Sequence, residues 1–181
     1  MLAWWMRYLQ EKAIGEVLQY ADCKILDVGC ATGNLILKLR KRVGGWLFGT
    51  DISPEMIKKA QIKLSGLAKV KLDIADAEKL PYRGNTFDYV ISTTALHHFP
   101  NPFLAVKEMS RVLKKAGKLV IIDTNLFLPA LNYLARLIGP GFVKMYTKKE
   151  FKRLFEMGGV LLVKQKRVGL FAILNVAVKT R

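Results

Sequence analysis

The chain has 181 residues and a mass of 20.4 kDa, and hydrophobic residues make up 51% of it. A chain of this length and composition forms one hydrophobic core, which excludes a long disordered, collagen-like or low-complexity segment. Thirty Lys and Arg against fourteen Asp and Glu give a net charge of +16, which attracts phosphates, nucleic acids, anionic lipid headgroups and acidic metabolites. We therefore expect a single basic domain over residues 1–181.

Cysteine content and hydropathy indicate a cytoplasmic protein. The two cysteines, Cys23 and Cys30, are too few for a disulfide framework, and together with two adjacent histidines they predict no metal site. The apolar residues 1–9 are too short for a signal peptide or a membrane span, and the apolar stretch 126–143 is interrupted by Arg136 and two prolines. No segment of the sequence therefore predicts a membrane-spanning helix.

Residues 1–20 predict an amphipathic helix ahead of the first strand, because apolar side chains recur at helical spacing. These side chains are Leu2, Trp5, Met6, Leu9, Ala13 and Val17. The neighbouring tryptophans Trp4 and Trp5 allow three interpretations: packing on the sheet, covering an active site, or contact with a membrane interface. The sequence leaves all three open.

Strands and helices then alternate along the chain. Short apolar or β-branched runs predict five strands, at 24–28, 46–50, 70–74, 87–92 and 118–123. The segments between them predict three helices, at 34–42, 54–64 and 102–113, and Ser53 and Asn101 precede two of these as N-caps. Alternating strands and helices of this length indicate a mostly parallel sheet that is covered on both faces.

The C-terminal part of the chain breaks this alternation. Residues 147–157 predict a helix that a Gly-Gly pair closes, and two strands follow at 160–167 and 170–179. A connection as short as Val168-Gly169 requires these strands to be antiparallel, because a parallel crossover needs about a dozen residues or more. The predicted fold is therefore doubly wound α/β, with a mostly parallel seven-stranded sheet and a C-terminal antiparallel hairpin.

A glycine-rich turn joins the first strand to the first helix of the sheet, with the sequence Asp27-Val28-Gly29-Cys30-Ala31-Thr32-Gly33-Asn34. Its small residues at 29, 31 and 33 let a ligand lie against the backbone, and N–H groups at the helix start can bind a carboxylate or a phosphate. A nicotinamide fingerprint needs a third small residue at position 34, where this chain has Asn. The spacing instead follows the pattern D-x-G-x-G-x-G, with Ala31 at its centre.

Five motifs in this order resemble those of the class I S-adenosylmethionine-dependent methyltransferases, specifically the group that acts on small molecules, quinones and lipids. After the glycine-rich turn come Gly49–Ser53, Asp76–Tyr82, Phe87–Phe99 and Arg111–Lys118. The resemblance covers residue 24 to about residue 123, which are expected to form the cofactor-binding core. It implies a Rossmann-like fold and an enzyme that takes a methyl group from S-adenosyl-L-methionine.

The resemblance also implies which residues hold the cofactor. Asp51 resembles the carboxylate that binds both ribose hydroxyls, since two acceptor oxygens on one side chain match a cis-diol. Asp76 resembles the acid that accepts a hydrogen bond from the adenine amino group. Asp27 is as well suited to bracing the glycine-rich turn as to contacting the cofactor. The full implied set is Asp27, Gly29, Cys30, Ala31, Gly33, Asp51, Ile52, Met56, Asp76, Ala77, Glu78 and Thr93, without a metal.

Two positions depart from the commonest form of the family. Ala31 replaces the central glycine, and Lys115-Ala116-Gly117-Lys118 replaces a commoner Pro-Gly-Gly turn. An alanine still permits close approach of the cofactor if its φ is negative. These departures leave the affinity for the cofactor open. Two further acids, Asp73 and Asp88, are interpreted as surface or structural residues.

The adjacent His97 and His98 follow the fourth predicted strand. Consecutive side chains rarely converge on one metal ion, so one of the two is expected to cap or pack. His98 is the candidate for a proton acceptor or a substrate hydrogen bond. Methyl transfer from a sulfonium is an in-line displacement that mainly needs alignment and exclusion of water, so the sequence need not contain a recognisable base.

The segments after the fourth and fifth strands bear on the methyl acceptor. Ser92-Thr93-Thr94-Ala95 stands where methyltransferases that act on amino groups of DNA bases carry Asn/Asp-Pro-Pro-aromatic, so no DNA substrate is expected. Residues 125–146 are rich in leucine and aromatic side chains, which suits a lid over a lipophilic acceptor or a core-packing helix. Basic residues in and after this segment suit anionic headgroups: Arg136, Lys144, Lys148, Lys149, Lys152 and Arg153.

The sequence supports three functional hypotheses. The leading one is methylation of a small, lipophilic acceptor, such as a phospholipid headgroup or a quinone precursor, by an enzyme that is cytoplasmic or peripheral to an anionic membrane surface. The second makes RNA the acceptor, because of the net charge, and it predicts binding that weakens steeply with salt. The third is a catalytically silent methyltransferase-like subunit that binds a partner and turns over no acceptor.

Overall fold

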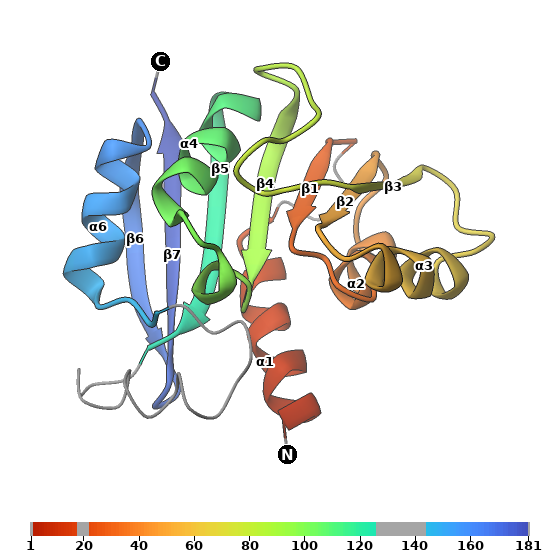
Figure 1. Ribbon diagram of the computed structural model, residues 1–181, viewed down its shortest axis with the longest axis horizontal. Coiled ribbons are helices and arrows are strands. Elements are labelled where there is room, and N and C mark those ends of the chain that lie inside the picture. Colours follow the sequence, from red (N-terminus) through yellow and green to blue (C-terminus); the bar gives the residue numbers. More distant parts are fainter. Residues whose placement is uncertain (1, 18–21, 126–143, 181) are drawn as a thin grey trace.

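A computed structural model of the chain describes residues 2–17, 22–125 and 144–180, and these contain a seven-stranded sheet (Figure 1). The strands are β1 (Ile25–Val28), β2 (Leu47–Asp51), β3 (Val70–Ile74), β4 (Phe87–Thr93), β5 (Leu113–Thr124), β6 (Val160–Val168) and β7 (Ala172–Lys179). Their order is β3-β2-β1-β4-β5-β7-β6, and β7 alone runs antiparallel to both of its neighbours. The predicted fold class is confirmed, including the C-terminal antiparallel hairpin.

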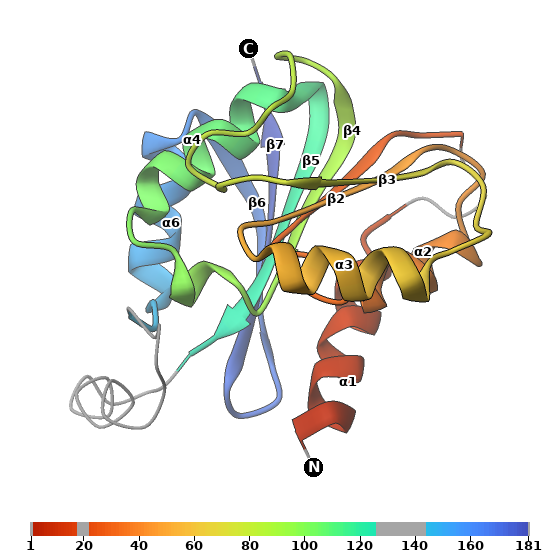
Figure 2. The same ribbon diagram turned by 45° about the vertical axis from the view of Figure 1, so that its right-hand side comes forward.

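Helices cover both faces of this sheet (Figure 2). They are α1 (Leu2–Ile14), α2 (Asn34–Arg40), α3 (Pro54–Lys63), the short 3-10 helix η1 (Leu96–His98), α4 (Pro102–Val112) and α6 (Lys148–Met157). Side chains of α1, α2 and α3 form one buried cluster with one face of the sheet, while α4 and α6 form a second cluster with the other face. The buried apolar side chains of the strands belong to one cluster or the other according to the face of the sheet on which they lie.

Capping residues fix where three of the helices begin. Ser53 Oγ accepts a hydrogen bond from Met56 N at 3.3 Å, and Asn101 Oδ1 accepts one from Leu104 N at 3.2 Å, so both predicted N-caps are confirmed. Thr147 lies just outside α6 and forms a capping box with Glu150. These bonds satisfy backbone N–H groups that have no partner within the helix.

Two elements differ from the sequence prediction by more than two residues at one end. The first helix ends at Ile14 because Gly15 follows it, and Glu16 N and Val17 N then bond three residues back in a tighter turn. Strand β5 begins at Leu113, not at residue 118, because Leu113 pairs with Phe87 ahead of a shift in register. The sequence pattern did not reveal this because the intervening residues 114–117 are polar or small.

The carboxyl ends of the parallel strands meet at one edge of the sheet, and four of the five motifs reach it. The fifth, Arg111–Lys118, lies at the start of β5 and therefore at the opposite edge. The connection between β6 and β7 lies at the same edge, because β6 runs in the direction of β5. This connection comprises residues 169–171 and is therefore one residue longer than predicted. No helix among the described residues is long and apolar enough to cross a membrane.

Most of the predicted lid, residues 125–146, lies outside the described part of the chain. Of its described ends, Asn125 Nδ2 donates a hydrogen bond to Tyr146 O at 2.6 Å, and Lys144 N donates one to His97 O at 3.4 Å. The segment that leads into α6 therefore returns beside β5 and η1, at the edge that carries the predicted motifs.

Candidate active site

A cavity of about 440 Å³ opens at the carboxyl ends of β1, β2 and β4. Its walls come from the glycine-rich turn, from the residues that follow β2 and β3, and from the segment that follows β4. The lining residues are Val28, Gly29, Ala31, Asp51, Ile52, Ala75, Asp76, Ala77, Thr94, Ala95, His98, Phe99 and Pro100. The fold thus brings together residues as far apart in the sequence as Val28 and Pro100.

At Gly29 the glycine-rich turn lines this cavity with backbone atoms, because glycine has no side chain. Gly29 adopts φ +76°, and a Cβ there would lie 2.5 Å from the Cβ of Ala95, so only glycine fits. Gly29 N and Cys30 N donate to Thr50 O at 2.8 and 2.9 Å, which holds the turn against β2. Alanine was expected to fit at position 31 if its φ is negative. The φ of Ala31 is +45°, so this condition is not met.

Asp51 is the best-oriented acid of the cavity. Its Oδ2 accepts a hydrogen bond from Ala31 N at 2.8 Å, and its Oδ1 accepts one from Ser53 N at 2.9 Å. Two backbone donors therefore fix the carboxylate, and each oxygen keeps acceptor capacity that points to the cavity it lines. A fixed pair of acceptors is the arrangement that binds two adjacent hydroxyls.

Asp27 lies beneath the glycine-rich turn and is fully buried. Its Oδ1 has no hydrogen-bond partner among the described residues. Burial, and secondarily the charge of Asp51, raises the pKa of Asp27 to about 8. Burial likewise raises the pKa of the Cys30 thiol, with Asp27 and Asp51 adding to the shift. A cationic group bound above the turn would compensate this carboxylate.

The loop after β3 supplies a second acid to the cavity. Asp76 Oδ1 accepts a hydrogen bond from Glu78 N at 2.9 Å, which shapes the turn and leaves the carboxylate exposed at the cavity. The Glu78 carboxylate has another role, because its Oε1 accepts a hydrogen bond from Asn101 N at 2.6 Å. Asp51, Asp76 and Asp27 make this region acidic in a protein of net charge +16.

Six of the residues predicted to hold the cofactor line the cavity: Gly29, Ala31, Asp51, Ile52, Asp76 and Ala77. Asp27, Cys30, Gly33, Met56, Glu78 and Thr93 are not among its described lining residues. Gly33 instead packs against Leu64 and Ala60, and Thr94 lines the cavity in place of its neighbour Thr93. The predicted site residues did not include Pro100, or Phe99, although Phe99 ends the motif Phe87–Phe99.

The two histidines have different surroundings. His98 is exposed and lines the cavity. His97 packs inward, with its Nδ1 2.5 Å from Asp123 Oδ1 and its backbone N donating to Asp123 Oδ2 at 3.2 Å. The expectation that one of the pair packs is confirmed. Asp123 is buried at the carboxyl end of β5, and sequence reasoning did not single it out.

The interpretation of Asp73 and Asp88 as structural acids agrees with their contacts. Asp73 Oδ2 accepts a hydrogen bond from the Tyr82 hydroxyl at 2.9 Å. Asp88 accepts one from Lys24 N at 2.8 Å and one from Lys114 Nζ at 2.7 Å. These bonds lower the pKa of Asp88 against the opposing effect of its burial.

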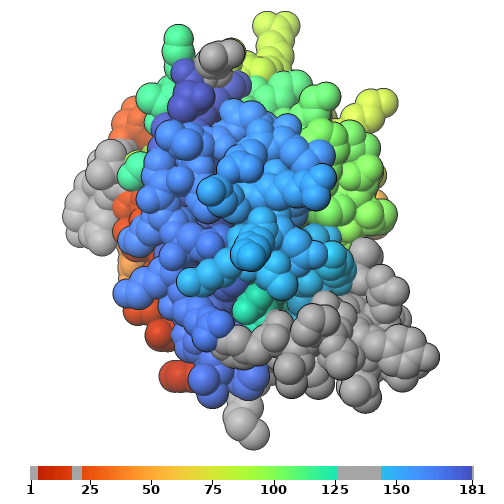
Figure 3. Space-filling view, turned by 90° about the vertical axis from the view of Figure 1, so that its left-hand side faces the viewer, coloured from red at the N-terminus to blue at the C-terminus, as the bar shows by residue number. Residues whose placement is uncertain are grey.

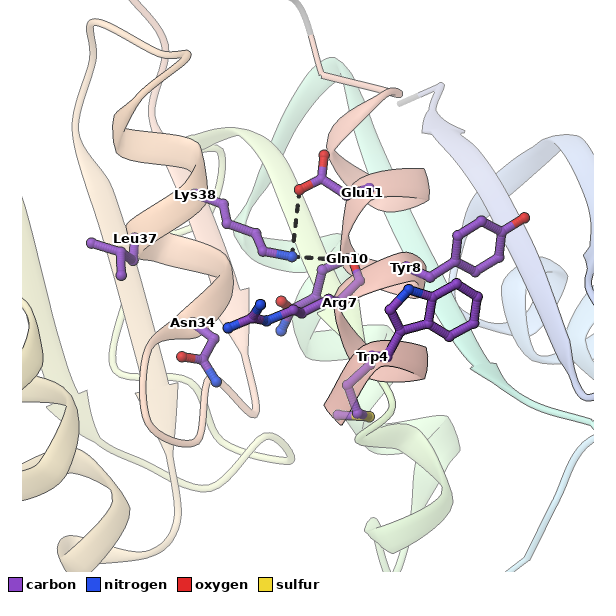
Figure 4. A pocket seen from close by; sticks show the side chains of 9 residues that line it. Trp4, Arg7, Tyr8, Gln10, Glu11, Asn34, Leu37 and Lys38 are labelled. Carbon is purple, nitrogen blue, oxygen red and sulfur yellow. Dashed lines mark hydrogen bonds and ion pairs between the residues drawn. The ribbon is translucent and has the colours of Figure 1, made fainter. Parts of the chain in front are cut away.

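A larger hollow of about 750 Å³ lies along α1 and α2 (Figure 4). Lys38 reaches across it from α2, donating to Arg7 O at 3.1 Å and pairing with Glu11 at 3.4 Å. Trp4 and Tyr8 stack on the other side of α1, with ring centroids 5.9 Å apart. The hollow adjoins the cofactor side of the sheet through Met6, whose Sδ lies 3.4 Å from Thr94 Oγ1.

Comparison with known proteins identifies the family. A family model described as a methyltransferase domain matches residues 20–159. The chain belongs to this family. The demethylmenaquinone methyltransferase of Staphylococcus aureus is 34% identical over 166 aligned residues, which cover 78% of this chain and 69% of that protein. The protein is therefore a class I methyltransferase, and S-adenosyl-L-methionine is its cofactor.

Solved structures share the fold of this methyltransferase. An S-adenosylmethionine-dependent methyltransferase from Aquifex aeolicus is 26% identical, with a TM-score of 0.79 and coverage of 96% of this chain and 92% of that chain. The YcgJ protein of Bacillus subtilis has a TM-score of 0.86 at 21% identity and covers 97% and 99% of the two chains. A Haloferax volcanii protein that was solved in complex with the Trm112 methyltransferase activator shares the fold, with a TM-score of 0.87 at 18% identity and coverage of 96% and 89% of the two chains.

Proposed function

We propose that this methyltransferase methylates a small, lipophilic acceptor of the reduced-quinone class. The observation that carries this proposal is the composition of the cavity wall after β4, where Ala95, Phe99 and Pro100 are apolar and His98 is the titratable side chain. The Staphylococcus aureus relative supports it, because its name gives a quinone as the acceptor. A phospholipid headgroup is the alternative acceptor within the same class of lipophilic molecules.

The opposite wall of the cavity suits the cofactor. Asp51 would bind the ribose hydroxyls with its two fixed oxygens, and Asp76 would accept from the adenine amino group. The bare backbone at Gly29 would admit the amino-acid end, over the uncompensated Oδ1 of Asp27. When bound, the cofactor supplies an electrophilic methyl group on a positively charged sulfur. The acidic cavity therefore matches its charge.

His98 is the proposed proton acceptor on the other side. A hydroquinone that gains a methyl group at carbon or oxygen loses one proton, and an imidazole nitrogen can accept it. The cofactor would supply the methyl group and keep the C–S electron pair on its sulfur, and His98 would take the proton that the acceptor releases. The apolar wall excludes water from this exchange, and Phe99 and Pro100 orient the flat ring.

The deciding experiment measures transfer of a labelled methyl group to three acceptors at matched salt: a short-chain demethylated naphthohydroquinone, phosphatidylethanolamine vesicles and a mixed transfer RNA. We expect product from the hydroquinone alone. Asp51→Ala should raise the Kd for S-adenosylmethionine by at least about 50-fold in calorimetry, because two charge-assisted hydrogen bonds are lost. His98→Ala should lower kcat and leave that Kd within about twofold.

Asp22→Asn is the matched control, because it changes an exposed acid outside the cavity lining. It should leave both the Kd and kcat at the wild-type value. Methylation of the vesicles or of the RNA would overturn the proposed acceptor class. Cofactor binding without turnover of any acceptor, together with a stable complex with another protein, would support the hypothesis of a silent subunit.

A lipophilic acceptor also supports contact between this methyltransferase and an anionic membrane surface. Lipophilic quinones and phospholipids partition into bilayers, and a net charge of +16 attracts the protein to anionic lipid. The described part of the chain contains no membrane-spanning helix. Any such contact would therefore be peripheral for the described residues, and RNA remains the alternative partner for the basic surface.

A further inference from the structure

Three large apolar side chains project from the same edge of the sheet as the cofactor cavity. Trp4, in the first turns of α1, is 69% exposed. Leu170 and Phe171, in the connection between β6 and β7, are 69% and 50% exposed. We name these three residues the apolar tip. Figures 1 and 2 show that the start of α1 and this connection lie at the same end of the molecule.

The apolar tip is held by contacts with its supporting backbone. Gly169 adopts φ +58°, and the Trp5 ring packs so closely on it that a Cβ there would lie 2.6 Å from the ring. This contact joins α1 to the β6–β7 connection. Phe171 O accepts a hydrogen bond from Asn125 N at 2.7 Å, which ties the connection to the end of β5. The exposed side chains therefore project from a fixed support.

A cationic depression lies directly beside the apolar tip. It has a volume of about 320 Å³ and runs between α1 and the β6–β7 hairpin. Its basic lining residues are Lys12, Lys164, Lys166 and Arg167. In Figure 3 the end of the hairpin and the atoms of α1 lie side by side at the lower end of this face.

Ion pairs neutralise the acids of this depression. Glu11 pairs with Arg42 at 2.8 Å and with Lys38 at 3.4 Å, and Glu16 pairs with Lys164 at 2.7 Å. Four basic side chains and two acidic ones line the depression, so its lining carries a net positive charge. A depression with this charge suits the phosphate groups of anionic lipids.

We propose that the apolar tip and the cationic depression together dock this methyltransferase on the surface of an anionic bilayer. Trp4, Leu170 and Phe171 enter the boundary between headgroups and acyl chains, and the depression contacts lipid phosphates. Met6 connects this surface to the cavity, because its Sδ contacts Thr94 in the cavity wall. Docking therefore turns the cavity towards the bilayer, in which a lipophilic acceptor dissolves. This role of docking rests on the proposed function.

A bilayer fits these features better than the other partners do. A second copy of the chain would bring two surfaces of the same charge together, which opposes association. RNA would engage the cations and stack on aromatic rings, but it offers no apolar environment to Leu170. Of these three partners, only an anionic membrane accommodates both the aliphatic side chain and the adjacent positive charge.

The test is co-sedimentation of the full chain with vesicles of phosphatidylglycerol and phosphatidylcholine, and with vesicles of phosphatidylcholine alone. Wild type should bind the anionic vesicles more tightly, with affinity that falls as salt rises. The double variant Leu170→Ser and Phe171→Ser should lose at least about tenfold in partition, because two apolar side chains no longer leave water. Lys166→Gln with Arg167→Gln should lose about tenfold or more on the anionic vesicles only.

Two control variants make the same changes elsewhere. Leu161→Ser with Val163→Ser alters exposed apolar side chains nearer the start of β6, away from the tip. Lys115→Gln with Lys118→Gln removes two charges at the turn before the main part of β5, at the opposite edge of the sheet. Both should partition within about twofold of wild type. Equal losses in test and control variants, or no binding by wild type, would overturn the proposal.

The remaining outcomes separate this proposal from the proposed function. Methylation of a water-soluble, short-chain hydroquinone without vesicles should be equal in wild type and in the Leu170→Ser, Phe171→Ser variant. A wild type that methylates this acceptor but binds no vesicles refutes docking alone. A wild type that binds vesicles but methylates no hydroquinone refutes the proposed acceptor alone. If light scattering shows a dimer that the tip variant abolishes, the surface is an interface between copies and docking is refuted.

Discussion

Two aspartates in neighbouring strands of the same site differ in what surrounds them. Asp51 accepts hydrogen bonds from Ala31 N and Ser53 N and lines the cavity. Asp27, one strand away, is buried beneath the glycine-rich turn, and one of its oxygens has no partner among the described residues. The first carboxylate is positioned to bind a ligand. Ionising the second costs free energy, which a cation bound nearby would offset.

This cost predicts how stability depends on pH. Burial first, and the charge of Asp51 second, raises the pKa of Asp27 to about 8, so between roughly pH 4 and pH 8 the folded state binds more protons here than the unfolded state. The contribution of Asp27 to the free energy of unfolding should therefore fall as pH rises through this window and level off above it. Asp27→Asn removes the titration and keeps the shape of the side chain.

The measurement is the melting temperature of both proteins without cofactor from about pH 5 to about pH 9. The variant should gain stability relative to wild type as pH rises, with the change complete above about pH 8. Saturating S-adenosylmethionine should reduce this difference, because its positive charge favours the ionised form of Asp27. Parallel curves for the two proteins without cofactor would show that Asp27 ionises at its ordinary pKa.

The backbone conformation of Ala31 is unfavourable for a residue with a side chain. Its φ of +45° is in the left-handed region, where a Cβ costs about 1 kcal/mol relative to glycine. Ala31→Gly should therefore raise the melting temperature by about 2–4 °C in a chain of this length. Ala105→Gly is the control, because Ala105 is buried in the helix α4 and glycine should lower the melting temperature there. A lower melting temperature for Ala31→Gly would mean that the methyl group packs favourably.

At the scale of elements, local signals predicted most of the architecture. Strand β3 has the predicted bounds Val70–Ile74, and Ser53 and Asn101 cap their helices because capping depends on residues within one turn. The pairing of His97 with Asp123 joins residues 26 positions apart and depends on how β4 and β5 align. The sequence shows both side chains, but the fold alone brings them together.

In the candidate site, too, some residues could be predicted from local sequence and others depend on the fold. Asp51 could be located because it follows a predicted strand, and strand ends are where ligands bind in such sheets. Asp76 could be located because its loop resembles that of the family. The roles of Thr94, Phe99 and Pro100 in the wall depend on the direction the chain takes after β4, which no local pattern fixes. The apolar tip was equally hidden, because Trp4 and Leu170 come from opposite ends of the chain.

The capping box of α6 gives a prediction at the scale of one element. Thr147 Oγ1 accepts from Glu150 N, and Glu150 Oε2 accepts from Thr147 N at 2.8 Å. Thr147→Ala removes the first bond and should lower the free energy of unfolding by about 1 kcal/mol, which is about 2–4 °C in melting temperature. Arg153→Ala, at an exposed position within the same helix, should change it by less than about 0.5 kcal/mol. Equal shifts in the two variants would contradict a stabilising cap.

At the scale of the whole molecule, the net charge of +16 acts against the folded state. Like charges lie closer together in a folded chain than in an unfolded one, so their repulsion destabilises the compact form. The ion pairs of the described residues are largely exposed, and pairs of this kind contribute about 0–1 kcal/mol each. Salt weakens both the repulsion among the thirty basic side chains and the attraction within these ion pairs. We expect the relief of repulsion to be the larger of the two effects.

The resulting prediction is that salt stabilises this methyltransferase. Raising sodium chloride from about 20 to about 200 mM shortens the screening length from roughly 20 Å to roughly 7 Å, so the melting temperature should rise by several degrees. The Lys115→Gln, Lys118→Gln variant should show a smaller rise, because its net charge is lower. Chloride is the appropriate anion, since sulfate and phosphate also stabilise by exclusion from the surface. A melting temperature that falls with chloride would mean that attractive pairs dominate, and the basic surface would then be largely neutralised within the fold.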